Sequence, residues 1–275
     1  MGWSKEELEI LKRDYQFYGS DTPINKSKSS IRVMAFSLGL SMSKEVISKR
    51  CSERQKGGKR DEKCSVDINR FINPDKYSSY ILGILWGDGH VNKKSTNISL
   101  KCIKTDIDEV ENVFDSTGKW CKYTYKRDNR KEQREFSISN KKLHKYFSDY
   151  NYIQKSYVAS TVQNNLDEDI KYYWWRGYFD ADGCLYVNKK HYTVQISIAS
   201  TYEQDWKFVE ELFMKLCCKY SIYRRNHKAK NGNISYSSSI MIRNKKDCLK
   251  FLDYIYQGEV FGLSRKYKKY LELKG

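Results

Sequence analysis

A glycine-bearing apolar segment occurs twice in the chain, first as residues 80–91 (YILGILWGDGHV) and again as residues 174–185 (WWRGYFDADGCL). The two copies align with Asp88 opposite Asp182, 94 residues further along. Each copy is followed by the same order of patterns: strand-like alternation, a helical stretch, two further alternating strands and a helical end. Two equivalent units in one chain predict a pseudo-twofold structure.

The predicted fold class is α+β, with two pseudo-twofold-related αββαββα half-domains that form a β-saddle. The half-domains are expected at residues 74–160 and 161–275, after a small all-α module at 1–56 and a basic linker at 57–73. After the first copy, the patterns predict a strand at 97–103, a helix at 106–116, strands at 120–127 and 133–139, and a helix at 141–150. After the second copy, the equivalent ranges are 192–199, 203–218, 219–226, 234–242 and 245–256.

The first 56 residues read as short helices joined by tight turns. Ser4 is a candidate N-cap, and Glu7 three residues later completes a capping box. A second helix is expected to open near Ser29 and to end at Gly39, and a third to start at Ser41 or Ser43. With its Trp-Ser-Lys-Glu-Glu opening, the segment resembles a Myb-like helix-turn-helix module; any small three-helix bundle fits the pattern as well.

Composition excludes several classes of protein. Lys and Arg outnumber Asp and Glu by 51 to 34, a net charge of +17, with 15% aromatic and 39% apolar residues. Such a chain has enough core-forming material to fold, and its charge favours a polyanionic partner. No apolar run is long enough to span a bilayer, and the N-terminus has no secretory pattern. The eight cysteines form no C-x-x-C pair and exclude a zinc ribbon or a small disulfide scaffold, so we expect reduced, mostly buried cysteines in a cytosolic protein.

Small residues four apart mark one face of each repeated segment. Gly83 and Gly87 in the first copy, and Gly177 and Ala181 in the second, would let two helix backbones approach closely. We therefore expect the two helices to pack against each other about the pseudo-dyad.

Each repeated segment ends in an aspartate followed by a glycine that stops the helix. If the helices pack as expected, Asp88 and Asp182 converge at their carboxyl ends. Two carboxylates there repel each other and the negative helix ends, so they require divalent cations, and oxygen ligands suit Mg²⁺, with Mn²⁺ as a substitute. The alternative explanation of a single Asp-Gly pair is a carboxylate that caps a turn and binds no metal.

Residues 81–89 (ILGILWGDG) and 175–183 (WRGYFDADG) resemble the two signature motifs of the LAGLIDADG homing endonucleases in their single-chain form. The resemblance implies a sequence-specific endonuclease that breaks both strands, leaves 3′ overhangs and mobilises an intron or a free-standing gene. It also implies that Asp88 and Asp182, with the backbone near Gly87 and Ala181, bind the metal. Trp86 replaces the inner acid, Asp180 in the second copy, so that position is not expected to be an essential ligand.

The resemblance further implies a basic residue near the scissile phosphate at the end of each half. Lys155 and Lys266 are the candidates, and they would stabilise transition-state charge. Arg265 competes with Lys266, because an adjacent register fits equally well. Lys104 matches another polar position of the pocket, with a counterpart near Ser200 or Thr201. An exposed surface lysine is the plain alternative for each.

Two basic regions follow the first helix of each half. Residues 119–145 hold ten Lys or Arg and three Asp or Glu, and residues 219–250 hold nine and one. Alternation places one set of side chains on a helix-packed face and the other on an exposed face, which would read the major groove of DNA. The candidate DNA-binding residues are Lys104, Lys122, Lys126, Arg127, Arg130, Gln133, Arg134, Gln195, Arg224, Arg225, Lys228 and Arg243.

The leading hypothesis is a Mg²⁺-dependent, site-specific double-stranded DNA endonuclease that acts as a monomer without a protein partner. A cytoplasmic location is expected, on nucleoid DNA or the DNA of a phage-infected cell. The alternative is a non-cleaving protein of the same fold, an intron maturase or a transcriptional regulator. The presence of both acids favours the enzyme, and a structural basic protein such as a ribosomal component explains the charge but not the repeat.

Overall fold

A computed structural model describes residues 2–48, 64–125, 131–188, 190, 193–228 and 234–275. The chain divides into two compact units, Met1–Glu62 and Lys63–Gly275, which we call the N-terminal unit and the C-terminal unit.

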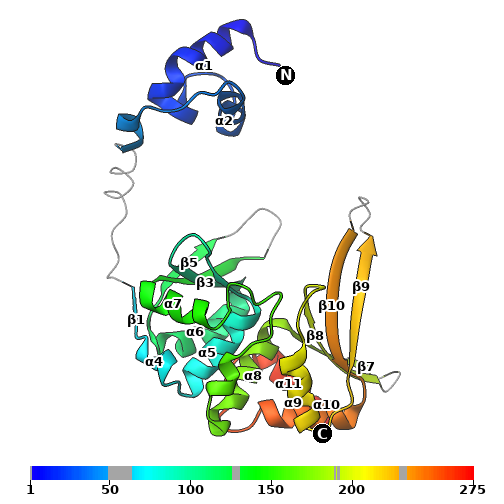
Figure 1. Cartoon of the computed structure of the whole chain (residues 1–275). Helices are drawn as coiled ribbons and strands as arrows, with labels where there is room; N and C mark the ends of the chain where they lie inside the picture. The colour runs from blue at the N-terminus through cyan, green and yellow to red at the C-terminus, as the bar shows by residue number, and fades with distance from the viewer. Residues whose placement is uncertain (1, 49–63, 126–130, 189, 191–192, 229–233) are drawn as a thin grey trace. The chain divides into compact units, whose positions relative to one another are not determined.

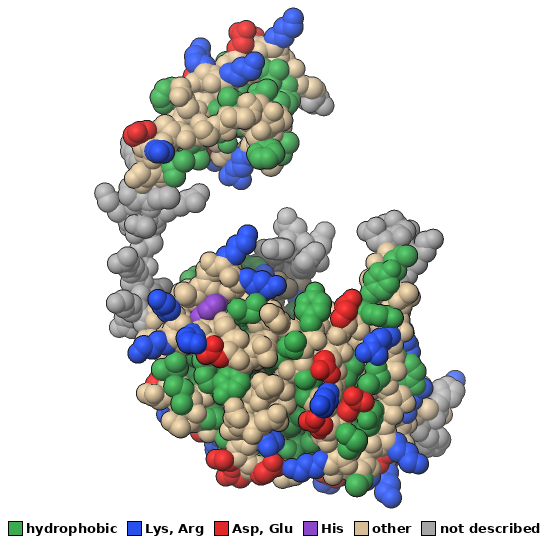
Figure 2. Space-filling model, viewed as in Figure 1, with side chains coloured by type: hydrophobic (Ala, Val, Ile, Leu, Met, Phe, Trp, Pro, Cys, Tyr) green, Lys and Arg blue, Asp and Glu red, His purple; other side chains and the backbone are tan. Residues whose placement is uncertain are grey.

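The N-terminal unit is helical in all its regular elements among the described residues. It contains α1 (Lys5–Tyr18), the 3₁₀ turn η1 (Gly19–Asp21), α2 (Lys28–Ser37) and a helical segment at 44–48. The capping box predicted at the start of α1 is confirmed, because the Ser4 side chain accepts from the Glu7 backbone and the Glu7 carboxylate accepts from the Ser4 backbone. Apolar side chains also reach its surface (Figure 2), and Phe36 on α2 is 88% exposed.

The C-terminal unit contains two halves with the same order of elements (Figure 1). The elements of the first half are α5 (Lys76–Gly87), β2 (Gly89–Val91), β3 (Asn97–Ile103), α6 (Lys104–Asp115), β5 (Cys121–Tyr125), β6 (Gln133–Ser139) and α7 (Lys141–Asp149). Those of the second half are α8 (Glu168–Asp182), β7 (Gly183–Asn188), β8 (Thr193–Ser200), α9 (Lys207–Lys215), β9 (Ser221–Lys228), β10 (Ile234–Ile242), α10 (Lys245–Ile255) and α11 (Ser264–Lys274).

Both halves build the same antiparallel sheet. The strand orders are β2-β3-β6-β5 and β7-β8-β10-β9, so equivalent strands occupy equivalent places. The predicted αββαββα order is thereby confirmed in each half. Strands β2 and β7 follow the repeated helices directly. The sequence patterns did not predict residue ranges for these two strands.

The helices α5 and α8 lie against each other between the two sheets (Figure 1). A Cβ atom added at Gly83 would lie 1.9 Å from the carbonyl oxygen of Trp174, and one added at Gly177 would lie 2.2 Å from that of Tyr80. No side chain fits at such separations, so the predicted small-residue interface exists and requires glycine at both positions.

Each sheet packs one face against helices. In the first sheet this face carries Ile98, Leu100 and Phe136, all fully buried, and in the second it carries Ile196 and Ile198. The strand alternation therefore has the expected period of two, with the residues between them on the opposite face. We call this opposite face the open face of each sheet.

Two features of residues 64–73 differ from the predicted linker. Strand β1 (Ser65–Val66) pairs with β4 (Gly118–Lys119), and α4 (Asn69–Ile72) follows, so this stretch is folded into the C-terminal unit. The β1–β4 pairing also brings Cys64 next to Cys121, and the two form a disulfide with a Cα–Cα separation of 5.7 Å.

The expectation of reduced, mostly buried cysteines was therefore wrong in part. Besides the disulfide, Cys184 and Cys217 are exposed among the described cysteines. A contact between residues 57 positions apart leaves no spacing signal in the sequence, which is why the pairing was missed.

Candidate functional site

The two repeated aspartates meet at the carboxyl ends of α5 and α8. Asp88 is the C-cap of α5, and Asp182 is the last residue of α8. The helices cross at their glycines, so their ends stay close: a Cβ atom added at Gly87 would lie 3.1 Å from the Asp182 carboxylate and 2.3 Å from the Ala181 side chain. The convergence expected from the repeat is present.

Burial raises the pKa of both acids. The pKa of Asp182 rises to about 6, chiefly because the protein excludes water from it and secondly because Asp88 lies nearby. Asp88 is exposed at the surface, yet the protein packed around it also raises its pKa, against the opposing effect of Lys155 and then Lys266. Two carboxylates in this state form a site of concentrated negative charge beside two lysines.

Lys155 reaches the end of α5 from the segment after α7. Its Nζ donates to the carbonyl oxygens of Leu85 at 3.3 Å, Gly89 at 2.6 Å and Gly87. Burial lowers its pKa to about 8, although the nearby Asp182 and Asp88 oppose that shift. Because helix carboxyl ends are negative, a cation is stabilised there.

Lys266 does the same at the end of α8. Its Nζ donates to the carbonyl oxygens of Phe179 at 2.5 Å, Asp180 at 2.9 Å and Gly183 at 2.5 Å, and the residue is 4% exposed. Burial lowers its pKa to about 8, opposed chiefly by Asp180. Leu85 and Phe179 are equivalent in the repeat, as are Gly89 and Gly183, so the two lysines occupy equivalent places and neither is an ordinary surface lysine.

The side chains of Lys266 and its neighbour Arg265 point to different places. The Arg265 side chain is 55% exposed and forms an ion pair of 2.8 Å with Asp106 of α6. Only Lys266 reaches the helix end, so it is the geometric counterpart of Lys155.

A cavity of about 260 Å³ opens beside Asp88. Its polar walls come from Lys101 and Asp106 of the first half and from Asp180 and Arg265 of the second. Lys104, which the sequence suggested for this pocket, lies instead at the start of α6 and pairs with Glu132 at 3.5 Å. Lys101, three residues earlier on the open face of β3, was missed because a single lysine in a strand carries no signal.

The inner motif position is buried in both halves. Asp180 is 2% exposed, and one of its oxygens accepts from the Tyr80 hydroxyl at 2.8 Å and the Leu263 backbone at 3.0 Å. Trp86 is 2% exposed and packs edge-on against Tyr152, with ring centroids 5.0 Å apart. Trp86 packs into the protein, whereas Asp180 is buried at the wall of the cavity.

Comparison with protein families identifies part of the chain. Residues 169–256 match the family model of the LAGLIDADG-like domain. The match begins with α8 and ends after α10, so it covers the second half and includes Asp182. The first half has the same order of elements and the same sheet topology.

An uncharacterized protein of Methanocaldococcus jannaschii, MJ0314, is 30% identical over 169 residues. The alignment covers 58% of this chain and spans 62% of the length of that relative.

Three solved structures are also similar. Variants of the homing endonuclease I-DmoI give a TM-score of 0.44 at 16% identity, covering 67% of this chain and 97% of that one. Full-length DUF199/WhiA from Thermatoga maritima gives 0.45 at 14%, covering 74% and 63%. The homing endonuclease I-WcaI bound to its DNA recognition sequence gives 0.42 at 21%, covering 65% and 80%.

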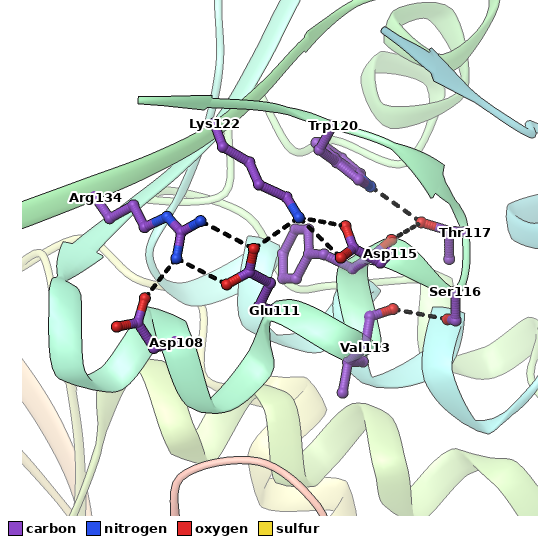
Figure 3. A network of polar contacts seen from close by, with 10 residues as sticks. Asp108, Glu111, Val113, Asp115, Ser116, Thr117, Trp120, Lys122 and Arg134 are labelled. Carbon is purple, nitrogen blue, oxygen red and sulfur yellow. Dashed lines mark hydrogen bonds and ion pairs between the residues drawn. The ribbon is translucent and has the colours of Figure 1, made fainter. Parts of the chain in front are cut away.

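Two of the residues selected for DNA binding lie on the helix-packed face of the first sheet (Figure 3). Arg134 forms ion pairs with Asp108 at 2.6 Å and Glu111 at 2.7 Å, and Lys122 contacts Glu111 at 2.8 Å and Asp115. The acidic side chains all belong to α6. The alternation predicted the period of the strands correctly, but it placed Lys122 and Arg134 on the exposed face, whereas both lie on the helix-packed face. The reason for selecting these two residues as DNA-binding therefore does not hold.

On the open face of the first sheet, Gln133 lies between Ile103 and Tyr125, and Lys101 lies opposite Glu135, with its Nζ 4.4 Å from the ring centroid of Tyr125. Lys126, Arg127 and Arg130 lie outside the described residues.

In the second half, three of the selected residues lie on the open face of the sheet. Arg243 and Arg225 stack on Tyr223, with 4.6 and 5.5 Å between each guanidinium carbon and the ring centroid, and Gln195 lies on the same face. Arg224 points to the opposite face, where its Nε donates to the carbonyl oxygen of Tyr202 at 3.2 Å. The side chain of Lys228 lies outside the described ones.

Basic side chains are not gathered into one patch on the face of the C-terminal unit drawn in Figure 2, where they alternate with acidic and apolar ones. Among the described residues, no group of three or more His, Cys, Asp or Glu side chains has the geometry to hold a metal ion. Within those same ranges, no helix is long and apolar enough to cross a bilayer.

Proposed function

We propose that this chain is a site-specific endonuclease that hydrolyses both strands of a DNA duplex with a divalent metal ion. The proposal rests on one observation above all: Asp88 and Asp182 converge at the ends of two crossed helices, and each end holds a lysine in an equivalent place. A duplex has two scissile phosphates related by a local twofold axis. A pseudo-twofold arrangement of one aspartate and one lysine at each helix end matches that symmetry.

The donor set fits Mg²⁺ or Mn²⁺. These hard cations take one or two carboxylates and complete their coordination with water and substrate phosphate oxygens, so a third protein ligand is not needed. Asp88 and Asp182 would hold the ion, together with backbone oxygens near Gly87 and Ala181; the Gly87 carbonyl accepts from Lys155 in this structure. The bound ion would supply Lewis-acid activation of water and of the leaving oxygen.

The protein's own groups would position the DNA and balance its charge. Lys155 and Lys266, held against the helix ends, keep positive charge next to the place where the phosphate must lie. Gln133, Gln195, Arg225 and Arg243 would contact the duplex from the open faces of the sheets. Phosphate contacts of this kind make binding fall steeply with salt.

We further propose that the N-terminal unit is a helix-turn-helix module that contacts flanking DNA. Its three helical segments, including the capped α1 and α2, support this assignment. A tethered second module raises the local concentration of its contacts and lengthens the site. Removal of residues 1–56 is expected to weaken affinity or shorten the footprint while the remainder still cuts. An unchanged footprint would remove the N-terminal unit from the interface.

The test of the main proposal is incubation of the full chain with Mg²⁺ or Mn²⁺ and DNA from the region around its own gene, in the form that lacks the gene or intron. Mapping the ends should give one staggered double-strand break with 3′ overhangs, absent with EDTA. The Asp88→Asn, Asp182→Asn double variant is the matched control and should bind without cutting. Specific binding by the unaltered chain without any break in either metal would instead support a maturase or a transcriptional regulator.

A further inference from the structure

The amino end of α11, which carries Lys266, is capped from the other half of the protein. The N-cap residue of α11, Leu263, provides no side-chain hydrogen bond. Glu109 of α6 provides it: one carboxylate oxygen accepts from the Ser264 backbone at 2.5 Å and the other from the Ser264 hydroxyl at 3.0 Å. A carboxylate at a helix amino end satisfies its free N–H groups and favours its dipole.

A second acid of α6 holds the next residue. Asp106 forms the 2.8 Å ion pair with Arg265, and its side chain is 16% exposed. On the other side, the buried Asp180 accepts from the Leu263 backbone at 3.0 Å. Residues 263, 264 and 265 are thus each fixed by one carboxylate, and Lys266 follows directly, placed against the end of α8.

The second half likewise holds the segment that carries Lys155, but through uncharged side chains. The Thr201 hydroxyl donates to the Ser156 carbonyl oxygen at 2.5 Å, and the Gln204 amide donates to that of Val158 at 3.1 Å. Gln204 is 2% exposed. Each half therefore holds the lysine-bearing segment of the other, through neutral contacts around Lys155 and through carboxylates around Lys266.

We propose that Glu109 and Asp106 are positioning residues that place Lys266 at its end of the active site, so that the first half controls the basic group of the second. The inference rests on the proposed function only in that Lys266 then acts during strand cleavage. Because Lys155 has its own supports, loss of the two carboxylates leaves Lys155 in place, although Asp106 also lines the cavity beside Asp88. The expected consequence is slower cleavage of one strand, with accumulation of nicked DNA.

The first test needs neither DNA nor metal. The full chain is trace-labelled with acetic anhydride, and the labelling rates of Lys266 and Lys155 are read from their peptides by mass spectrometry. In the Asp106→Asn, Glu109→Ala double variant, Lys266 should react faster by on the order of tenfold, since a charge-assisted cap is lost. Lys155 should be unchanged and serves as the internal reference.

Two further variants separate positioning from general loosening of α6. Glu109→Gln keeps an oxygen that accepts from Ser264 and should restore most of the protection of Lys266. Asp108→Asn removes the same charge one residue away, where the side chain pairs with Arg134 and not with α11, and should label as the unaltered chain does. If the double variant does not fold, Arg265→Gln breaks the ion pair from the α11 side. Unchanged labelling of Lys266 in the folded double variant, or in Arg265→Gln where the double variant does not fold, overturns the proposal.

The second test uses a supercoiled plasmid that carries the site found by end mapping. The double variant should convert it to nicked circles at the normal rate and to linear DNA about tenfold more slowly. Equal slowing of both strands would overturn the strand-selective part. A failure of the unaltered chain to cut would count against the proposed function, while the labelling result would still decide the positioning role.

Discussion

The two halves of the C-terminal unit differ most where their repeated helices end. α5 ends in Trp86, Gly87 and Asp88, whereas α8 ends in Asp180, Ala181 and Asp182. The outer aspartate is the same in both, and so is the lysine that donates to the carbonyl oxygens of each helix end. The inner residue is an aromatic ring in one half and a buried carboxylate in the other. The two halves share the aspartate and the lysine that the proposed chemistry needs. They differ in the side chain that packs at the inner position.

The largest expected effect comes from removing one outer acid at a time. If both halves take part in cleavage, Asp88→Asn and Asp182→Asn should each slow double-strand cleavage by about a thousandfold or more, the equivalent of several kcal/mol of transition-state stabilisation. DNA binding should stay largely intact, as measured by a gel-shift assay at fixed salt. Full cleavage by either single variant would show that the two halves are not equivalent in function.

Replacing Lys155 and Lys266 tests whether the two lysines contribute equally to cleavage, and the expected effect is smaller than for the aspartates. Lys155→Met and Lys266→Met should each slow cleavage by about a hundredfold, because a positive charge is lost beside the reacting phosphate. Arg265→Gln is the matched comparison next to Lys266 and should have a smaller effect, since its side chain points to Asp106. Single-turnover rates on a strand-labelled duplex give all three values. A larger effect for Arg265 than for Lys266 would reverse the assignment.

Substitution of the glycines at the helix crossing should be equally destabilising in the two halves. An added Cβ atom at Gly83 or Gly177 meets backbone oxygen atoms, which cannot rotate away. Gly83→Ala and Gly177→Ala should each lower the free energy of unfolding by about 3 kcal/mol or more. Urea unfolding followed by the fluorescence of buried tryptophans such as Trp120 and Trp174 measures it. Gly275→Ala, whose added Cβ would lie 3.7 Å from its nearest neighbour, is the control. A cost below about 1 kcal/mol in either half would mean that the helices do not approach this closely.

The repeat explains how much of this site the sequence could predict. Small residues at helical spacing and an Asp-Gly end occur twice at the same offset, so the crossing of the helices and the convergence of Asp88 and Asp182 follow from local pattern and symmetry. The element order could be predicted for the same reason, since amphipathic period distinguishes helix from strand. The places of Lys155 and Lys266 depended on the family resemblance, because nothing local marks either residue.

Contacts between distant segments could not be predicted. The face of Lys122 and Arg134 depends on the acids that α6 presents to the sheet, and alternation fixes the period of a strand but not its phase. The Cys64–Cys121 disulfide depends on the pairing of two two-residue strands. The cap that Glu109 provides to α11 joins residues 155 positions apart.

The last contrast concerns how the helices α7 and α10 begin, and it predicts a difference in acid sensitivity. Asn140 caps α7 and Asn244 caps α10, but only α10 has a carboxylate three residues on, Asp247. Its pKa is held well below the usual range by Lys250, by the Lys219 backbone and by Asn244.

A carboxyl group with a depressed folded pKa stabilises the protein fully above its unfolded pKa of about 4, and this stabilisation is lost as the pH falls toward the folded value. Asp247→Asn should therefore cost about 2 kcal/mol at pH 7, and the cost should shrink toward zero as the solution approaches pH 2. Asn140→Ala in the first half removes an uncharged cap and should cost about 1 kcal/mol with little dependence on pH. Urea unfolding of both variants between pH 7 and the lowest pH at which the chain stays folded provides the comparison. A cost for Asp247→Asn that does not change over that range would show that its carboxylate charge contributes no more to the second half than the neutral cap does to the first.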